Sequence, residues 1–449
     1  MTWKPAVAAV LAVVAAAAAS GQINGGGEDD FHVYTEAPRL FLRPQRLRLL
    51  RRERERQSIR WQQFQLLMAG KARMPEPAFA GALYYQITGD ESYGRRAIAW
   101  ALDTRARDLR ELALVADWCG KLLKPAEAQA LDRKLEQGLA STGHAGSVAV
   151  VRSRVLAAIA LADRNPQLSE AVLRQTVAAW WRGRIAPAME AGGDPVPRDQ
   201  MFALLELLHA IRDNLNIELR EDAAGYFKHL PTCLMLSHYP APYPAAENLY
   251  RIPANEVAGE PDLEKAALSR AAGLALVAYD TNALENQYLQ GWLIQDRYLL
   301  RSAFGAAYEF LWANPYQPGL TYYHVPLFFH DAPSGRLFVR SSWDDDATWF
   351  GVFDGHRQLF ADGKVRELGR TGEVRLGASI VIPAVSPMRF TLDGQEPETV
   401  YVVGLKPRAP YDIEVDDEEM CEQPADAAGT LELNITAASA NTGVRIQAR

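Results

Sequence analysis

The sequence changes character near residue 335. Before this position, apolar residues recur with a helical period, and after it short apolar runs alternate with Gly and Pro turns. The transition stretch, residues 335–349, contains an alternating apolar segment followed by three consecutive aspartates, Asp344–Asp346. The pattern predicts an α-helical domain followed by a β domain, with residues 336–340 as the first clear strand of the β domain.

The helical part shows many helices separated by short Gly, Pro and Asn breaks. The predicted helices begin near Pro44 and then cover 58–71, 76–88, 91–102, 109–123, 125–139, 148–162, 167–181, 200–214, 219–230, 263–279 and 293–313. No fixed sequence period is visible, which fits the consensus solenoid families poorly. We therefore predict an incomplete (α/α) toroid of helical hairpins over residues 37–315.

The remaining residues, 316–449, contain short β-branched and aromatic runs between turns. The predicted strands are 336–340, 348–353, 379–382, 399–403, 411–415, 430–435 and 443–447. Short strands of this kind are typical of a short antiparallel β-sandwich.

The N-terminus is typical of an export signal. Lys4 precedes an unbroken apolar run, residues 6–19, and small residues at 18–20 form a cleavage site. The run is short for a bilayer span, so residues 1–20 are predicted to be a signal peptide and the mature chain to have no stable membrane insertion. An uncleaved anchor is the alternative. Residues 21–36 read as a disordered lead-in, and the predicted location is periplasmic or secreted.

Charge and cysteine content exclude several classes of function. The formal net charge of -7 argues against a nucleic-acid binder. The three cysteines, Cys119, Cys233 and Cys421, have no metal-site spacing, and we predict neither a metal nor a cofactor. The first two lie in apolar helical contexts and are predicted to be buried; any disulfide is left open. The acidic runs 344–346 and 416–419 are predicted to be solvated turns rather than Ca²⁺ sites.

Four segments resemble a known family in their order along the chain. They are Ala-Pro-Arg-Leu-Phe-Leu at 37–42, the Ala-Leu-Tyr-Tyr-Gln-Ile-Thr-Gly-Asp helix end at 82–90, residues 113–118 and the strand at 335–349. Together they resemble the heparinase II/III-like and alginate-lyase-like polysaccharide lyases over roughly residues 37–350. The resemblance implies a toroid, a β domain and β-elimination on a uronic-acid-containing glycan. That reaction needs a group to neutralise the carboxylate, a base and an acid.

The resemblance also implies candidate site residues. His144 precedes a predicted helix where the family often places His or Asn, although a His at a helix start can also have no special role. A Pro-rich loop over 237–261 offers Tyr250 as acid/base and Tyr243 and Arg251 for substrate binding, with simple packing as the alternative for each Tyr. His356 is the one His of the segment where the family has His-x-His-Asp-x-Gly, and no carboxylate adjoins it in the sequence. We thus predict His144, Tyr250 and His356 as catalytic.

Two other functions remain open. The missing histidines, and the absence of Glu and Tyr after Gly193, favour a non-catalytic glycan-binding or cell-envelope protein on the same scaffold. A glycoside hydrolase is the third hypothesis, because Asp194, Asp199 and Glu247 lie near helix ends and loops. Nucleophile-elbow, His-Glu-x-x-His and phosphate-loop motifs are absent. A polysaccharide is the expected partner; its sugar and linkage and the oligomeric state are left open.

Overall fold

The computed structural model describes residues 29–141, 146–241, 251–255, 262–295, 303, 305–369, 372–385, 388–392, 397–436 and 441–449. Phe31–Arg449 form one compact unit, distinct from Met1–Asp30. The predicted signal peptide lies outside the described residues. Within the described ranges, no helix has the length and apolar character that crossing a bilayer requires.

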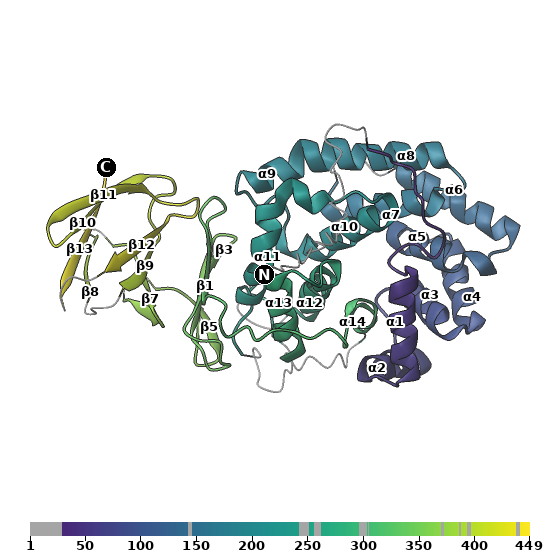
Figure 1. Cartoon of the computed structure of the whole chain (residues 1–449), viewed down its shortest axis with the longest axis horizontal. Helices are drawn as coiled ribbons and strands as arrows, with labels where there is room; N and C mark the ends of the chain where they lie inside the picture. Colours follow the sequence, from purple (N-terminus) through teal and green to yellow (C-terminus); the bar gives the residue numbers. More distant parts are fainter. Residues whose placement is uncertain are drawn as a thin grey trace, which may run out of the picture. The chain divides into compact units, whose positions relative to one another are not determined.

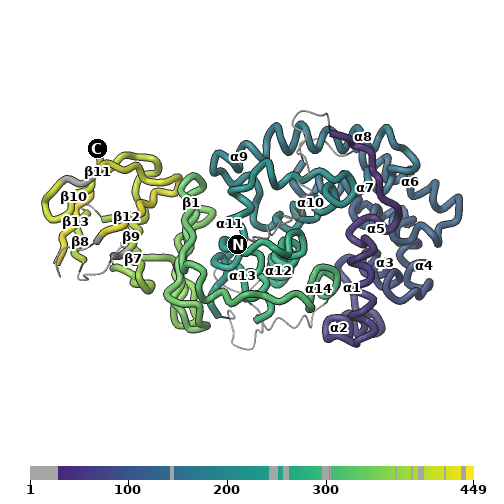
Figure 2. Tube along the Cα trace, viewed as in Figure 1, coloured from purple at the N-terminus to yellow at the C-terminus, as the bar shows by residue number. Residues whose placement is uncertain are grey.

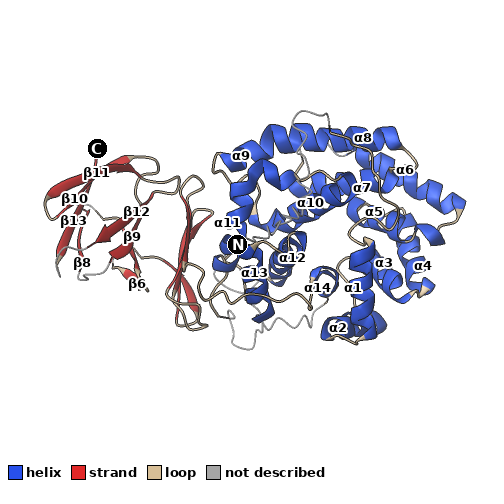
Figure 3. Cartoon of the chain, in the orientation of Figure 1, coloured by secondary structure: helices blue, strands red, loops and turns tan. Residues whose placement is uncertain are grey.

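The predicted order, helices first and strands second, is confirmed (Figures 1 and 3). The described α-helices are α1 (Pro44–Glu55), α2 (Ile59–Ala69), α3 (Pro77–Thr88), α4 (Glu91–Leu102), α5 (Leu109–Trp118), α6 (Pro125–Ser141), α7 (Val148–Leu161), α8 (Pro166–Arg174), α9 (Ala186–Glu190), α10 (Met201–Leu215), α11 (Ala224–Leu236), α12 (Leu263–Tyr279), α13 (Leu284–Gln295) and α14 (Ala306–Trp312). Short 3₁₀ turns η1 (Gly120–Leu122), η3 (Arg198–Gln200) and η4 (Leu219–Ala223) join some of them.

Alternate helices pack side by side, as expected for helical hairpins arranged in a ring. α3, α5, α7, α10 and α12 contact one another in that order, and α14 contacts both α12 and α2. The two ends of the series therefore meet, although they are far apart in the sequence (Figure 2). Trp61 on α2 packs against Phe310 on α14 with 5.5 Å between the ring centroids.

Several helix starts were predictable because the capping residues are aspartates. Asp90, Asp108 and Asp262 each accept a hydrogen bond from a backbone N–H in the first turn of α4, α5 and α12. An N-cap carboxylate satisfies a donor that the helix itself leaves free. The predicted starts at 91, 109 and 263 are confirmed.

Several predicted helices differ from the structure. The helix predicted over 109–123 ends at Trp118, and residues 219–230 comprise η4 and only the first part of α11. Residues 167–181 were expected to form one α-helix, but α8 is followed by a π-helix, η2 (Gln175–Ile185), which leads into α9. Apolar periodicity does not separate these two windings over a few turns. Residues 293–313 contain the end of α13 and all of α14, and Gly305 before α14 has φ 98°. This left-handed conformation is incompatible with a continuous α-helix.

The strands form three sheets. The first sheet contains β1 (Phe328–Asp331), β2 (Arg336–Arg340), β3 (Trp349–Phe353), β4 (His356–Ala361) and β5 (Lys364–Glu367), in that order. The second has the order β12 (Thr430–Thr436), β9 (Pro397–Val403), β7 (Ser379–Pro383), β6 (Val374–Leu376). The third has the order β11 (Glu418–Pro424), β10 (Pro410–Val415), β13 (Thr442–Ala448), β8 (Met388–Leu392).

Side chains of the second sheet point alternately to two buried faces, so the second sheet lies between the other two. Val381 and Tyr401 of the second sheet share an apolar cluster with residues of the first sheet. Ile380 and Val400, their neighbours in sequence, share a cluster with residues of the third sheet. Neighbouring residues on a strand point to opposite faces, so both faces of the second sheet are covered.

The β part differs from a two-layer antiparallel sandwich in two respects. A third sheet is present, and β7 and β9 pair in parallel, whereas the other pairs between the named strands are antiparallel. The parallel pair arises because β8, which lies between them in sequence, belongs to the third sheet. The expectation that residues 336–340 form the first strand was wrong, since β1 precedes them and pairs with β2.

Other expectations from the sequence are confirmed. Asp344–Asp346 form an exposed turn, and Asp416 and Asp417 form the positive-φ turn between β10 and β11. Cys119 and Cys233 are buried free thiols, and Cys421 is free and exposed.

Candidate functional site

A cavity of about 1140 Å³ lies where α9, η3, α11 and the start of α12 face β1 and β2. We call it the cleft. One wall is helical, and α11 packs directly against β1 and β2 of the other wall. Trp349 fixes this arrangement, since its indole N–H donates to the carbonyl of Leu236 at the end of α11 over 2.7 Å.

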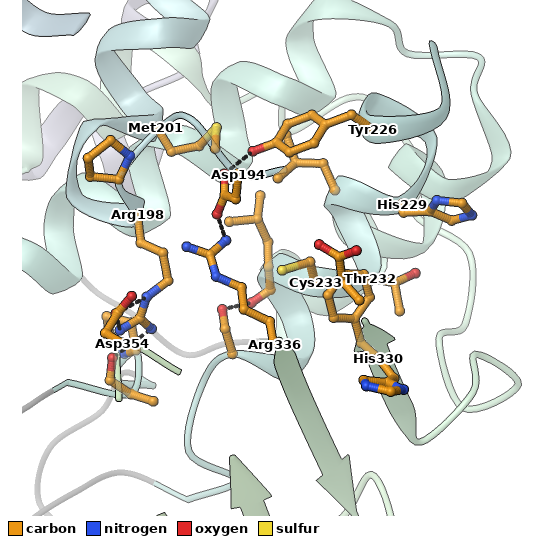
Figure 4. A pocket seen from close by; sticks show the side chains of 18 of the residues that line it. Asp194, Arg198, Met201, Tyr226, His229, Thr232, Cys233, His330, Arg336 and Asp354 are labelled. Atoms are coloured by element: carbon orange, nitrogen blue, oxygen red, sulfur yellow. Dashed lines mark hydrogen bonds and ion pairs between the residues drawn. The ribbon is translucent and has the colours of Figure 1, made fainter. Parts of the chain in front are cut away.

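Asp194 lies at the centre of the charged groups in the cleft (Figure 4). The Tyr226 hydroxyl on α11 donates to Asp194 Oδ1 over 3.1 Å. Arg336 on β2 forms an ion pair with Asp194 Oδ2. The side chains of Asp194 and Arg336 are 6% and 14% exposed. The three residues come from three elements and join the two walls of the cleft.

A glycine pair brings Asp194 to this position. Gly192 has φ 77°, and a Cβ atom there would collide with the ring of Pro333 in the turn between β1 and β2. Only glycine combines this conformation with so close an approach. The Gly192-Gly193 break therefore lets the chain pass close beside the β turn immediately before Asp194.

The surroundings of Asp194 favour its ionised form. An adjacent guanidinium and a donated hydroxyl both stabilise a carboxylate. Burial raises the pKa of Tyr226 well above its usual value, so its hydroxyl stays protonated and remains a donor. Asp194 is thus a fixed negative charge at the cleft wall.

A second ion pair crosses the cleft. Arg198 of η3 bonds Asp354, in the turn between β3 and β4, over 2.9 Å. The same guanidinium donates to the carbonyl of Ala254 over 2.9 Å and lies 4.6 Å from the ring centroid of Phe353. These contacts hold η3, and with it Asp199, next to the first sheet.

His330 on β1 joins the first and second sheets. Its Nδ1 lies 2.5 Å from a carboxylate oxygen of Glu432 on β12, and its Nε2 lies 3.1 Å from Asp426. The two carboxylates outweigh the opposing effect of burial and raise the pKa of His330 to about 9. The imidazole is therefore charged at neutral pH. Both ring nitrogens are engaged, so His330 supports the β1 wall rather than exchanging protons with a ligand.

The other ionisable side chains of the cleft differ in their surroundings. Burial raises the pKa of Cys233 to about 12, which leaves its thiol unreactive at neutral pH. His229 and Lys265 are exposed at the lining. Among the described residues, no group of three or more His, Cys, Asp and Glu could hold a metal ion.

The site residues predicted by resemblance do not assemble here as far as the structure describes them. His144, Tyr243 and Tyr250 lie outside the described residues, as does Glu247. His356 is on β4 and does not line the cleft. No carboxylate adjoins it in the sequence, but in the fold Glu367 on β5 lies 3.3 Å from its Nδ1. Strand pairing, not sequence proximity, supplies this partner.

Arg251 also lies outside the lining of the cleft. It forms an ion pair with Asp345 over 3.3 Å, and its guanidinium is 5.3 Å from the ring centroid of Trp292. Two of the carboxylates on which the hydrolase hypothesis depends, Asp194 and Asp199, do line the cleft.

Nothing in the sequence indicates that four residues belong to this site: Tyr226, Arg198, His330 and Arg336. Each is an ordinary residue in its own helix or strand, and only the packing of α11 and η3 against the first sheet brings them together. The Gly192-Gly193 break was the one visible signal.

Comparisons with known proteins do not show a family for this chain. No protein-family model matches the chain, and no curated protein matches it. A solved structure described as "Glycoside hydrolase" aligns with 83% of this chain and 71% of its own at 9% sequence identity, with a TM-score of 0.32. At this TM-score the alignment carries no conclusion about fold or function.

Proposed function

We propose that the protein acts on a glycan in the cleft and hydrolyses its glycosidic bonds. The observation that carries the proposal is Asp194, a carboxylate held by Tyr226 and Arg336 at the wall of a large cavity with further carboxylates. Pockets for drug-sized ligands measure roughly 300–1,000 Å³. A cavity of about 1140 Å³ is large enough for more than one sugar ring.

Glycoside hydrolysis commonly uses two carboxyl groups. In this proposal Asp194 is the ionised carboxyl group. It either attacks the anomeric carbon or stabilises the positive charge that develops there. Asp199 is the second. It is exposed at the cleft lining, and it has no ionic partner among the described side chains. Its carboxyl group is therefore not held by the protein, and a glycan bound over it would exclude water and favour the protonated form that can give a proton to the leaving oxygen.

Tyr226 and Arg336 are positioning residues in this proposal. They hold both oxygens of Asp194 and keep the carboxylate in one orientation. Such fixed charges stabilise a transition state because they need no reorganisation during the reaction.

The charges of the cleft favour hydrolysis over elimination. A lyase must neutralise the carboxylate of a uronic acid. Arg336 and Arg198 are already paired with Asp194 and Asp354. Lys265 is the one lysine or arginine of the described lining without an acidic side-chain partner.

β-Elimination is the second candidate. The specific observation in its favour is that a tyrosine, Tyr226, and an arginine, Arg336, lie on either side of one carboxylate in the cleft. A tyrosine can serve as acid and base, and an arginine can bind a uronate. The resemblance seen in the sequence is consistent with this chemistry.

The two reactions give different products from one assay. Purified protein is incubated with neutral, amino and uronic-acid polysaccharides, and both reducing ends and the ultraviolet absorbance of unsaturated sugars are followed. Hydrolysis predicts reducing ends without absorbance, whereas elimination predicts both. Saturable binding without either product would instead support the non-catalytic glycan-binding protein.

Two variants connect the activity to the cleft. Asp194→Asn keeps the shape of the side chain but removes its charge, and it should lower the rate by about 10²-fold or more. Glu55→Gln removes an exposed carboxylate of α1 that does not line the cleft, and it should have no effect. A wild-type rate in Asp194→Asn would refute the proposal.

A further inference from the structure

The lining of the cleft contains more acidic than basic side chains. In the described residues, seven carboxyl side chains line it, against three from lysine and arginine. The acidic set is Glu190, Asp194, Asp199, Asp262, Asp331, Asp354 and Glu432, and the basic set is Arg198, Lys265 and Arg336. We infer that the cleft selects a glycan with free amino groups, such as units of a hexosamine that lacks the N-acetyl group. This inference rests on the proposed action on a glycan.

The internal ion pairs leave part of this acidic set unneutralised. Arg336 and Arg198 compensate one carboxylate each, and the charged His330 compensates Glu432 together with Asp426. These three cations are already paired within the protein, so they do not neutralise the other carboxylates of the cleft. A ligand with its own positive charge gains more from this cleft than a neutral one.

Four carboxylates remain without a cationic side-chain partner in the described structure, and one of them, Asp262, caps α12 by accepting the backbone N–H of Lys265. Glu190 at the end of α9 and Asp199 on η3 are exposed. Asp331 at the end of β1 is half-buried, and its carboxylate accepts a hydrogen bond from the neutral Ser334 hydroxyl over 2.5 Å. These carboxylates belong to both walls, so a cation in the cleft meets negative charge from either side. Among the lining residues that the structure describes, Lys265 is the one ammonium group opposing them, and it has no acidic side-chain partner there.

An aromatic ring accompanies the carboxylates. Phe328 on β1 lines the cleft and is 40% exposed, so its ring is accessible to a ligand there. The face of an aromatic ring attracts an ammonium group, and the same ring offers an apolar surface to a sugar. Phe328 and Asp331 lie at the two ends of the edge strand β1 and both line the cleft, so this strand offers an apolar ring and a carboxylate at different points of the cleft.

The same charges act against other ligands. A uronic-acid oligomer would bring further negative charge next to uncompensated carboxylates, and such repulsion excludes ligands as effectively as attraction selects them. A cationic peptide shares the charge of an amino sugar but not its flat, hydroxyl-bearing rings. The experiment must therefore distinguish a cationic peptide from an amino sugar as the ligand.

The experiment is a calorimetric comparison of four tetramers on the full-length protein. The probes are a glucosamine tetramer, its N-acetylated form, a galacturonate tetramer and tetralysine. The glucosamine tetramer should bind about tenfold more tightly than the N-acetylated one, and the difference should shrink at 0.5 M salt because exposed charges are screened. The galacturonate tetramer should bind most weakly.

Variants test whether the unpaired carboxylates cause the preference. Glu190→Gln should weaken binding of the glucosamine tetramer about threefold, and Glu190→Gln with Asp331→Asn should weaken it further. Binding of the N-acetylated tetramer should stay constant. The control Glu55→Gln should change neither affinity.

The outcomes separate this inference from the proposed function. Equal affinity for the two glucosamine tetramers, or a preference for galacturonate, would overturn the inference and leave action on a glycan intact. Tetralysine binding as tightly as the glucosamine tetramer would overturn it in favour of a peptide ligand. If no glycan bound, the proposed function would fail and the inference with it.

Discussion

The contact of His330 with two carboxylates makes the stability of the protein depend on pH in a defined range. His330 lies on β1, Glu432 on β12, and Asp426 in the preceding turn. The ring of Tyr401 packs edge-on at 5.8 Å between centroids. We predict that raising the pH removes the charge of the imidazole and weakens this connection between the first and second sheets.

The magnitude follows from the pKa. A histidine in an unfolded chain titrates near 6.5, and His330 titrates at about 9 in the folded protein. One pKa unit corresponds to about 1.4 kcal/mol, so the contact contributes about 3 kcal/mol while the imidazole is charged in the folded state. A pKa raised by folding stabilises fully below about 6.5, and that contribution disappears as the pH rises through about 9. The side chain is 8% exposed, so solvent screening is small.

The assay is urea denaturation of the wild type and of His330→Gln at pH 6 and pH 10. Glutamine does not titrate, so the wild type should lose about 3 kcal/mol more of its unfolding free energy over this range than the variant does. Other titrating groups are common to both proteins and cancel in the difference. Equal losses in the two proteins would refute the assigned role of His330.

Two further predictions concern the helical part. Glu206 is fully buried between Arg110 and Arg152, so Glu206→Ala should lower the unfolding free energy by about 3–5 kcal/mol, because it leaves buried charge unpaired; a loss below 1 kcal/mol in chemical denaturation would contradict this. Asp117 accepts two backbone N–H bonds of 2.8 Å, one from Leu40, so Asp117→Ala should cost about 3 kcal/mol in thermal unfolding and Asp117→Asn less; equal losses would show that these hydrogen bonds are unimportant.

The sequence predicted those elements whose ends carry a local chemical signal. The helix Leu263–Tyr279 was predicted correctly because Asp262 caps it and apolar residues continue to its end. The strand Arg336–Arg340 was also predicted, as its residues alternate between two buried clusters. By contrast, β1 lacks such alternation and follows Pro326, and it was not among the predicted strands. The π-helix Gln175–Ile185 has no distinct sequence pattern.

The candidate site was less predictable because it depends on long-range packing. Asp194, Tyr226 and Arg336 are separated by 32 and 110 residues, and nothing in the sequence connects them. The predicted residue His356 illustrates the reverse problem: its segment matched the family by position, but β4 places it outside the cleft lining. The Gly192-Gly193 break indicated the region around residue 194, but only the fold shows that Tyr226 and Arg336 contact Asp194.

The most direct measurement is a crystal structure of Asp194→Asn with a glycan fragment bound. The substitution should slow cleavage enough for an intact oligosaccharide to be seen. We predict a sugar ring in the cleft, with its glycosidic oxygen near Asp199 and its anomeric carbon facing residue 194. A glycan bound elsewhere, for example beside His356 and Glu367, would refute the assignment of the cleft as the active site.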